Sequence, residues 1–147
     1  MRLTARLAGR RAYLDANVFI YAVEGFAPFD EALASLLDGI ERQEIEAVTS
    51  ELTLAEVLVV PIREGAQSTV DRYVQTIRSQ DGLSVVPVTR EILVEAARLR
   101  ATNRLKLADA IHVATALASG CGVFLTNDDR PRVPERLDVL RIADFAA

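Results

Sequence analysis

A chain of 147 residues is long enough for one domain with a single core, and its apolar half excludes extended disorder. The single cysteine, Cys121, excludes an internal disulfide and a cysteine-based zinc site. The formal net charge of −4 argues against the broadly basic surface that is typical of nucleic-acid-binding proteins. Any contact with nucleic acid therefore has to come from local clusters of basic residues.

The N-terminal segment superficially resembles a signal peptide, because four arginines in the first eleven residues precede an apolar stretch. Asp15 and Asn17 interrupt that stretch, and no small-residue cleavage site follows. No apolar run approaches the roughly 18 residues that a membrane helix needs. We therefore expect a cytoplasmic protein without a membrane anchor, in which Met1–Arg11 is an N-terminal extension that is free to be flexible.

Short apolar runs alternate with amphipathic stretches along the rest of the chain. The runs predict strands at Ala12–Leu14, Ile45–Thr49, Leu83–Val88, Gly122–Leu125 and Leu137–Ile142. Apolar residues at helical spacing predict helices at Asn17–Glu24, Phe29–Gln43, Glu51–Val60, Gln67–Ser79, Arg90–Thr102 and Leu107–Ser119. Pro61 is expected to end or kink the third of these helices. This alternation predicts an α/β fold with three layers (α/β/α), built around a mostly parallel sheet of four to five strands.

Acidic residues follow two of the predicted strands. Asp15 ends the first strand and directly precedes a helix, and Asp128 and Asp129 follow the strand at Gly122–Leu125. In open α/β sheets, ligands bind in the crevice at the carboxyl ends of the strands. The alternative for Asp128 is a plain turn residue, since Asn-Asp pairs are common in turns.

Two further acids lie within largely apolar helices. The helix that carries Asp109 is apolar almost all round, so it is expected to be buried, and a buried carboxylate needs a partner. The alternative is that Asp109 caps the helix or pairs with Arg104 or Lys106. Glu56 also lies among apolar residues, and a salt bridge to Arg63 is its alternative explanation.

Four carboxylates in one crevice repel one another, so without a cation some of them would have to be protonated. The candidate ligands are carboxylate oxygens, with no cysteine among them and only one histidine in the whole chain. Such a set favours Mg²⁺ or Mn²⁺ over zinc or copper. Mg²⁺ usually completes its shell with water and substrate phosphate oxygens. A site of this kind suits phosphodiester hydrolysis, because the ion acidifies a water and neutralises charge on the phosphate.

Four segments resemble the PIN domain family, in the family's order: YLDANVFIY, TSELTLAEVL, LADAIHVATAL and FLTNDD. The resemblance runs from about Ala12 to Ile142 and is to the short, single-domain members, many of which are VapC-type toxins. It implies one PIN-like domain over residues 1–147, with Asp15 on the middle strand, and a ribonuclease that depends on Mg²⁺ or Mn²⁺. Met1–Arg11 is longer than the extension that short members usually carry.

The motif match implies a role for each acid. Asp15 and Asp109 would bind the metal directly, Glu56 would act directly or through water, and Asp128 would complete the site. The polar residues that match positions orienting these acids are Asn17 and Thr126. His112, one helical turn from Asp109, is expected to be a core histidine or a residue that supports the metal ligands, and not a catalytic base.

The same resemblance implies an RNA substrate and a small antitoxin partner. We expect the antitoxin to insert an arginine or an apolar helix near the acids, beside the apolar helices Asn17–Glu24 and Glu51–Val60. The apolar excess of these helices also suggests a homodimer. Two alternatives keep the fold: a PIN-like protein-binding module without catalysis, and a housekeeping RNA-processing nuclease. A phosphotransfer domain is disfavoured, because a phosphatase of the haloacid dehalogenase type usually has a second Asp at Asn17, and a receiver domain needs a late Lys where Asp128 stands.

Overall fold

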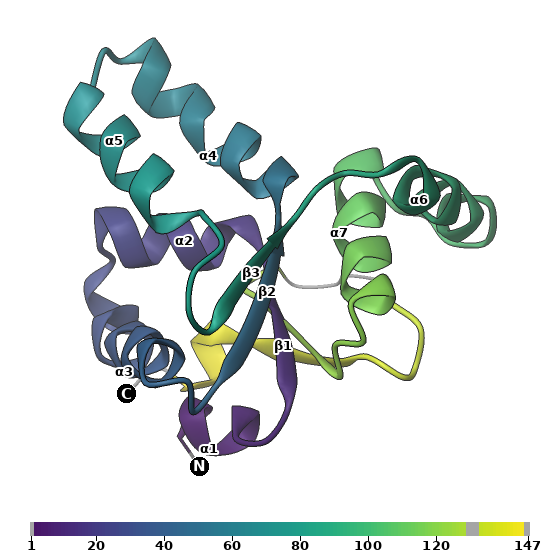
Figure 1. Ribbon diagram of the computed structural model, residues 1–147, viewed down its shortest axis with the longest axis horizontal. Coiled ribbons are helices and arrows are strands. Elements are labelled where there is room, and N and C mark those ends of the chain that lie inside the picture. Colours follow the sequence, from purple (N-terminus) through teal and green to yellow (C-terminus); the bar gives the residue numbers. More distant parts are fainter. Residues whose placement is uncertain (1, 129–132, 146–147) are drawn as a thin grey trace.

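The computed structural model describes residues 2–128 and 133–145, which contain one sheet of five strands (Figure 1). The strands are β1 (Arg11–Leu14), β2 (Glu46–Ser50), β3 (Leu83–Val86), β4 (Val123–Thr126) and β5 (Asp138–Arg141). Their order is β3-β2-β1-β4-β5, and every neighbouring pair is parallel. The predicted parallel sheet with Asp15 at the end of its middle strand is therefore confirmed.

Seven α-helices cover the two faces of this sheet in the described parts of the chain (Figure 1). They are α1 (Leu3–Leu7), α2 (Ala16–Glu24), α3 (Asp30–Glu41), α4 (Glu51–Arg63), α5 (Gln67–Thr76), α6 (Arg90–Thr102) and α7 (Leu107–Ala118). The first five share one hydrophobic cluster with the sheet, and α6 and α7 share the other. Because successive strand residues point to opposite faces, Ala12 and Leu14 pack in the first cluster and Tyr13 in the second. The three-layer α/β/α prediction is confirmed.

The N-terminal segment differs from the flexible extension that we expected. It forms α1, whose Leu3 and Leu7 are buried in the core beside α3. Arg6 and Arg10 reach across to Asp138 on the edge strand β5, at 3.4 and 3.0 Å. A five-residue helix is too short to show a periodic pattern, so only its long-range packing reveals it.

Asp138 is the shared partner of both arginines, and its replacement measures what their ion pairs contribute. We expect Asp138→Asn to lower the free energy of unfolding by no more than about 1 kcal/mol, because all three side chains are part-exposed. Urea unfolding at low and high salt checks this, since screening should shrink the difference. The matched control is Glu46→Gln, which removes one exposed pair with Arg11. A large, salt-independent loss in Asp138→Asn would contradict the prediction.

The end of α4 lies beyond the predicted boundary at Val60. The helix continues through the buried Pro61 to Arg63. Pro61 lies in the last turn, so its missing N–H removes only one hydrogen bond near the helix end. The following turn is closed by Glu64 N–H to the Val60 carbonyl, at 2.9 Å. No helix within residues 2–128 and 133–145 is both long and apolar enough to cross a membrane.

Candidate active site at the carboxyl end of the sheet

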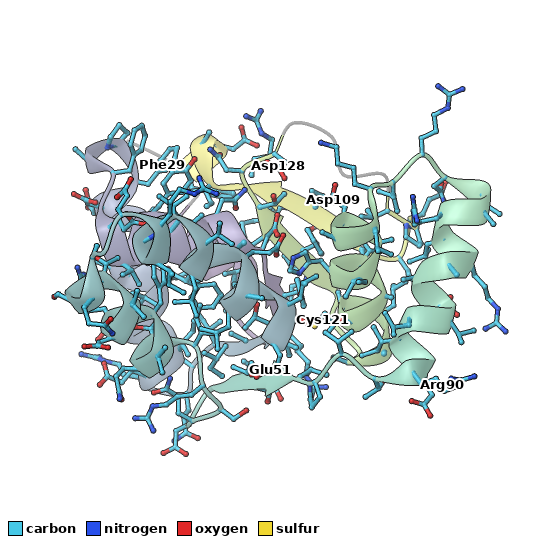
Figure 2. The ribbon with its side chains drawn as sticks, turned by 90° about the horizontal axis from the view of Figure 1, so that it is seen from above. Phe29, Glu51, Arg90, Asp109, Cys121 and Asp128 are labelled. Carbon is cyan, nitrogen blue, oxygen red and sulfur yellow. The ribbon has the colours of Figure 1, made fainter. Side chains whose placement is uncertain are left out.

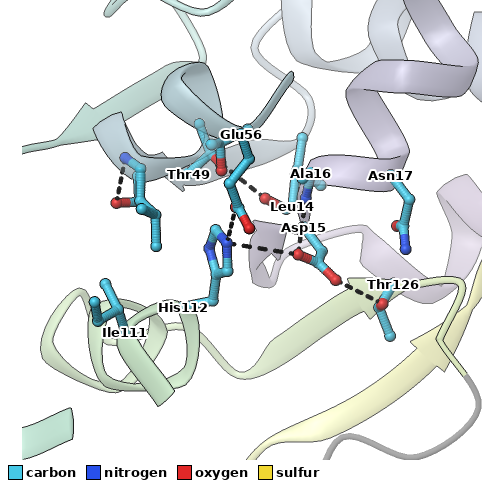
Figure 3. A network of polar contacts seen from close by, with 12 residues as sticks. Leu14, Asp15, Ala16, Asn17, Thr49, Glu56, Ile111, His112 and Thr126 are labelled. Carbon is cyan, nitrogen blue, oxygen red and sulfur yellow. Dashed lines mark hydrogen bonds and ion pairs between the residues drawn. The ribbon is translucent and has the colours of Figure 1, made fainter. Parts of the chain in front are cut away.

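Asp15 stands at the junction of β1 and α2, and its carboxylate is held from two sides (Figure 3). Oδ1 accepts the N–H of Ala16 at 2.8 Å, which caps α2, and Oδ2 accepts the hydroxyl of Thr126 at 2.8 Å. The parallel register of β1 and β4, with Leu14 beside Leu125, brings Thr126 to this position. Only 8 % of Asp15 is exposed, so both oxygens have fixed positions.

A buried threonine ties the end of β1 to the start of α4. The Thr49 hydroxyl donates to the carbonyl oxygen of Leu14 at 2.8 Å and accepts from the Thr53 hydroxyl, also at 2.8 Å. Both threonines are fully buried. The peptide that precedes Asp15 is therefore anchored to the neighbouring strand and helix.

Asn17 and Thr126 hold the loop that carries Asp128. The Oδ1 atom of Asn17 accepts the N–H of Asn127 at 3.2 Å, and Nδ2 lies 3.5 Å from Oδ1 of Asp128. The Thr126 hydroxyl oxygen accepts the N–H of Asp128 at 3.1 Å. Asp129, the second acid that follows this strand in the sequence, lies outside the described residues.

Three of the four predicted acids line one cavity of about 340 Å³: Asp15, Asp109 and Asp128. Figure 2 shows Asp109 and Asp128 near each other at this edge of the sheet. Burial, followed by the charges of Asp15 and Asp128, raises the pKa of Asp109 above its ordinary value, although His112 opposes the shift. The three carboxylates therefore share one electrostatic environment.

The structural alternatives for Asp109 do not hold. Asp109 lies in the first turn of α7, but the capping position belongs to Lys106, and no side-chain cap is formed there. Within residues 2–128 and 133–145, no salt bridge joins Asp109 to Arg104 or Lys106, although both cations line the same cavity. Among the described residues, Asp109 therefore has neither a side-chain hydrogen bond nor a salt bridge, and the charge of His112 is what favours its ionised form.

Glu56 is placed differently from the other three acids, because it is bound by a histidine and is not among the residues that line the cavity. Its Oε1 atom lies 2.5 Å from Nε2 of His112, which is itself 3.8 Å from Oδ1 of Asp15 (Figure 3). The predicted alternative, a salt bridge to Arg63, is not formed in the described part of the chain. Glu56 is therefore linked to Asp15, which does line the cavity, through His112.

His112 is buried and bridges two helices to the central strand. Its Nδ1 atom shares a 2.5 Å hydrogen bond with the Tyr13 hydroxyl. Burial alone would lower the pKa of His112, but the Glu56 hydrogen bond and the charges of Asp15, Glu56 and Asp109 raise it overall. Burial, with the charge of Asp15, also raises the pKa of Tyr13 well above its ordinary value, so the phenol keeps its proton.

Sequence reasoning missed this chain from Tyr13 through His112 to Glu56. The position of His112 on the same helical stripe as Asp109 was a usable signal, and the histidine does support one of the predicted acids. Tyr13 gave no such signal, because an aromatic residue in a buried strand is usually part of the core. Its ring does stack on Phe124, with centroids 5.2 Å apart.

The donor set suits a hard divalent cation, since it consists of carboxylates, and burial together with their mutual repulsion raises the pKa of Asp109. Of the three acids that line the cavity, Asp15 is buried, Asp109 is half-buried and Asp128 is exposed. Among the described residues, no three side chains of the Asp, Glu, His and Cys types already enclose an ion. The residues present therefore fit a cation held partly by water and substrate, as Mg²⁺ commonly is.

The model of the PIN domain family matches residues 12–137. The chain belongs to the PIN domain family. A search of curated proteins found no match.

Solved structures share the fold of this PIN domain. A toxin–antitoxin complex from Klebsiella pneumoniae aligns with a TM-score of 0.64 and 21% identity, over 86% of this chain and 94% of that one. VapBC2 from Rickettsia felis, bound to a promoter DNA fragment, aligns with a TM-score of 0.67 and 18% identity, over 89% of this chain and 98% of that one. VapC20 of Mycobacterium tuberculosis, described as a toxin that cleaves the sarcin–ricin loop, aligns with a TM-score of 0.60 and 16% identity. The alignment covers 77% of this chain and 86% of that one. The TM-scores of 0.60 to 0.67 show a common fold.

Proposed function

We propose that this PIN domain is an endoribonuclease that depends on Mg²⁺ or Mn²⁺ and is the toxin of a toxin–antitoxin pair. The observation that carries the proposal is the cavity that Asp15, Asp109 and Asp128 share, in which the pKa of Asp109 is raised. Carboxylates that lie together in a partly buried cavity repel one another, and a bound cation would relieve that repulsion. The toxin–antitoxin complexes among the structural neighbours support the biological role.

In this proposal Asp15 and Asp109 bind the metal directly, and Asp128 completes the site from the loop that Asn17 and Thr126 hold. Glu56 acts directly or through water. A bound Mg²⁺ or Mn²⁺ supplies positive charge that neutralises the phosphate and acidifies a water.

The chain's own residues then fix the geometry of this site. The Ala16 N–H and the Thr126 hydroxyl each hold one oxygen of Asp15, so this carboxylate needs no rearrangement to bind an ion. His112 holds Glu56. Preorganised ligands of this kind reduce the reorganisation that catalysis would otherwise require.

A small antitoxin is the proposed protein partner, and a homodimer is the proposed assembly. The outer surface of α4 exposes Val59, Val60 and Ile62, at 49%, 51% and 60%. Three neighbouring apolar side chains on one helix end are suited to an apolar helix of a partner. An arginine from the same partner would complement the acids of the cavity. The alternative of a housekeeping RNA-processing nuclease shares the site but requires no such inhibitor.

Metal dependence tests the proposed activity directly. We expect purified protein to cleave RNA with Mg²⁺ or Mn²⁺, to lose that activity in excess EDTA, and to recover it when the metal is restored. The control for a contaminating nuclease is Asp15→Asn, prepared identically, which should remain inactive with metal. Full activity in excess EDTA would contradict metal dependence. If the metal-loaded wild type cleaves no RNA, the protein-binding module becomes the better interpretation.

A further inference from the structure

Two cations line the same cavity as the three acids. Arg104 and Lys106 are exposed residues of the loop between α6 and α7, and both line that cavity. Neither forms a salt bridge with any residue in the described ranges 2–128 and 133–145. Cations beside carboxylates would ordinarily pair with them, so the two cations remain available to a ligand here.

The loop that carries these cations is itself fixed. The Asn103 side chain donates to a carbonyl at the end of α6 at 3.1 Å, and the Leu105 N–H donates to the Asn103 carbonyl at 3.0 Å. Arg100 donates through Nε to the Leu105 carbonyl at 3.1 Å, and Leu105 packs against the hydrophobic cluster under α6 and α7. Because Leu105 is anchored, the residues on either side of it are presented from a defined position.

Charge decides what this arrangement binds. A phosphodiester chain approaching three carboxylates is repelled except where a cation compensates, and a metal at the acids compensates only one phosphate. Cations that line the same cavity can supply the contacts that position a nucleic-acid backbone without reading its bases. Three apolar residues, Leu105, Val113 and Phe124, also line the cavity.

We propose that Arg104 and Lys106 bind the RNA phosphate next to the one that is cleaved. This inference rests on the proposed ribonuclease function and names the part of the substrate that the cavity holds. The substrate is then a chain with at least two successive phosphates, lying across the cavity from the acids to the loop. Both residues are positioning residues, and they contribute mainly to substrate binding.

The experiment compares two double variants that remove the same charge. Arg104→Gln/Lys106→Gln removes the loop cations, and Arg42→Gln/Arg90→Gln is the matched control. Arg90 begins α6, well away from Asp109 in Figure 2, and Arg42 ends α3 on the other face of the sheet, in an exposed pair with Asp38. Exposed pairs of that kind contribute little to stability.

Binding of single-stranded RNA is measured by fluorescence anisotropy over a salt series, with Asp109→Asn added to every protein to prevent cleavage. Each phosphate contact in single-stranded RNA contributes about 0.7 to the slope of log affinity against log salt. We expect the loop variant to bind about 10-fold more weakly at low salt and to lose about 0.7 from that slope, since the two cations share one phosphate. The control pair should change neither. With Asp109 intact, the loop variant should raise KM and largely keep kcat.

The outcomes separate this inference from the proposed function. An unchanged slope, or an equal loss in both double variants, would overturn the inference, because the effect would then be absent or one of overall charge. A fall in kcat with unchanged KM would also overturn it. If the wild type cleaves no RNA but the slope still falls in the loop variant alone, phosphate binding at these residues is supported and the nuclease proposal fails.

Discussion

Asp109→Asn is expected to reduce RNA cleavage by at least about 100-fold while leaving the metal-free protein as stable as the wild type, or more stable. The loss of activity follows from the removal of one proposed metal ligand from the cavity. The stability result follows from the raised pKa of Asp109, which shows that its charged form is disfavoured in the folded state. The two readouts together separate a catalytic carboxylate from a structural one.

The pH dependence of this effect has a definite sign. Burial and the charges of Asp15 and Asp128 raise the pKa of Asp109 above its ordinary value of 3.8. Its contribution to stability is therefore fully present below the unfolded-state pKa and is lost as pH rises through the folded-state pKa. Asn does not ionise, so Asp109→Asn avoids this loss. Its free energy of unfolding should therefore exceed that of the wild type at pH values above the folded-state pKa of Asp109. Urea unfolding in EDTA across the acidic to neutral range measures it.

The matched control for this experiment is Asp81→Asn, an exposed turn residue beside Gly82. It removes the same charge at a position where Asn is equally suited to a turn, so stability and activity should both stay near wild type. A destabilisation of Asp109→Asn by more than about 2 kcal/mol in EDTA would contradict the prediction. A loss of that size is typical of removing one member of a buried ion pair.

His112→Gln is expected to destabilise the metal-free protein by about 1–3 kcal/mol at mildly acidic pH. A glutamine amide cannot bond to Tyr13 and Glu56 at once, whereas His112 contacts both at 2.5 Å. The variant therefore leaves at least one buried polar group without its partner. Denaturant unfolding in EDTA, with the metal removed so that it cannot mask the change, gives the difference in free energy.

The sign of the pH effect at His112 follows from its raised pKa. Burial alone would lower this pKa, but the Glu56 hydrogen bond and the nearby carboxylates raise it above the ordinary 6.5. The stabilisation is fully present below pH 6.5 and is lost as pH rises through the folded-state pKa. The difference in free energy of unfolding between the wild type and His112→Gln should therefore become smaller as pH rises through the folded-state pKa of His112.

Tyr13→Phe is the matched control for the histidine variant. It removes only the hydroxyl and keeps the ring that stacks on Phe124. The hydrogen bond between His112 and Glu56 stays in place. Its stability should fall less, and the wild-type pH dependence should remain. If His112→Gln shows the same pH dependence as the wild type, the charged histidine is not its source.

The sheet and its layers were predictable from the sequence because buried parallel strands and amphipathic helices leave local patterns. The same patterns placed Asp15 after β1, Asp109 in α7 and Asp128 after β4, and strand order then brings these three acids to one cavity. Helix α1 escaped prediction because Leu3 and Leu7 are buried only through contact with a distant helix. No local pattern reports such contacts.

The placement of Glu56 was beyond sequence reasoning for a related physical reason. A glutamate among apolar residues of α4 shows that a partner is needed, but the identity of that partner depends on how α4 and α7 pack. The structure gives it His112, a residue 56 positions away in the chain. In the sequence, Arg104 and Lys106 were candidates only for pairing with Asp109, because their place in the cavity lining depends on the fold.

The capping role of Asp15 affects how a loss of activity would appear among sequences of this kind. The side-chain oxygens of Asp15 cap α2 and accept the Thr126 hydroxyl. A related chain that had lost catalytic activity would therefore still gain stability from Asp or Asn at this position. Asp109 accepts no hydrogen bond from any described residue, and its ionised form is disfavoured in the fold. A chain freed from selection for nuclease activity should therefore lose Asp109 first. In comparing sequences of this type, a retained aspartate at position 109 is the better indicator of a working enzyme.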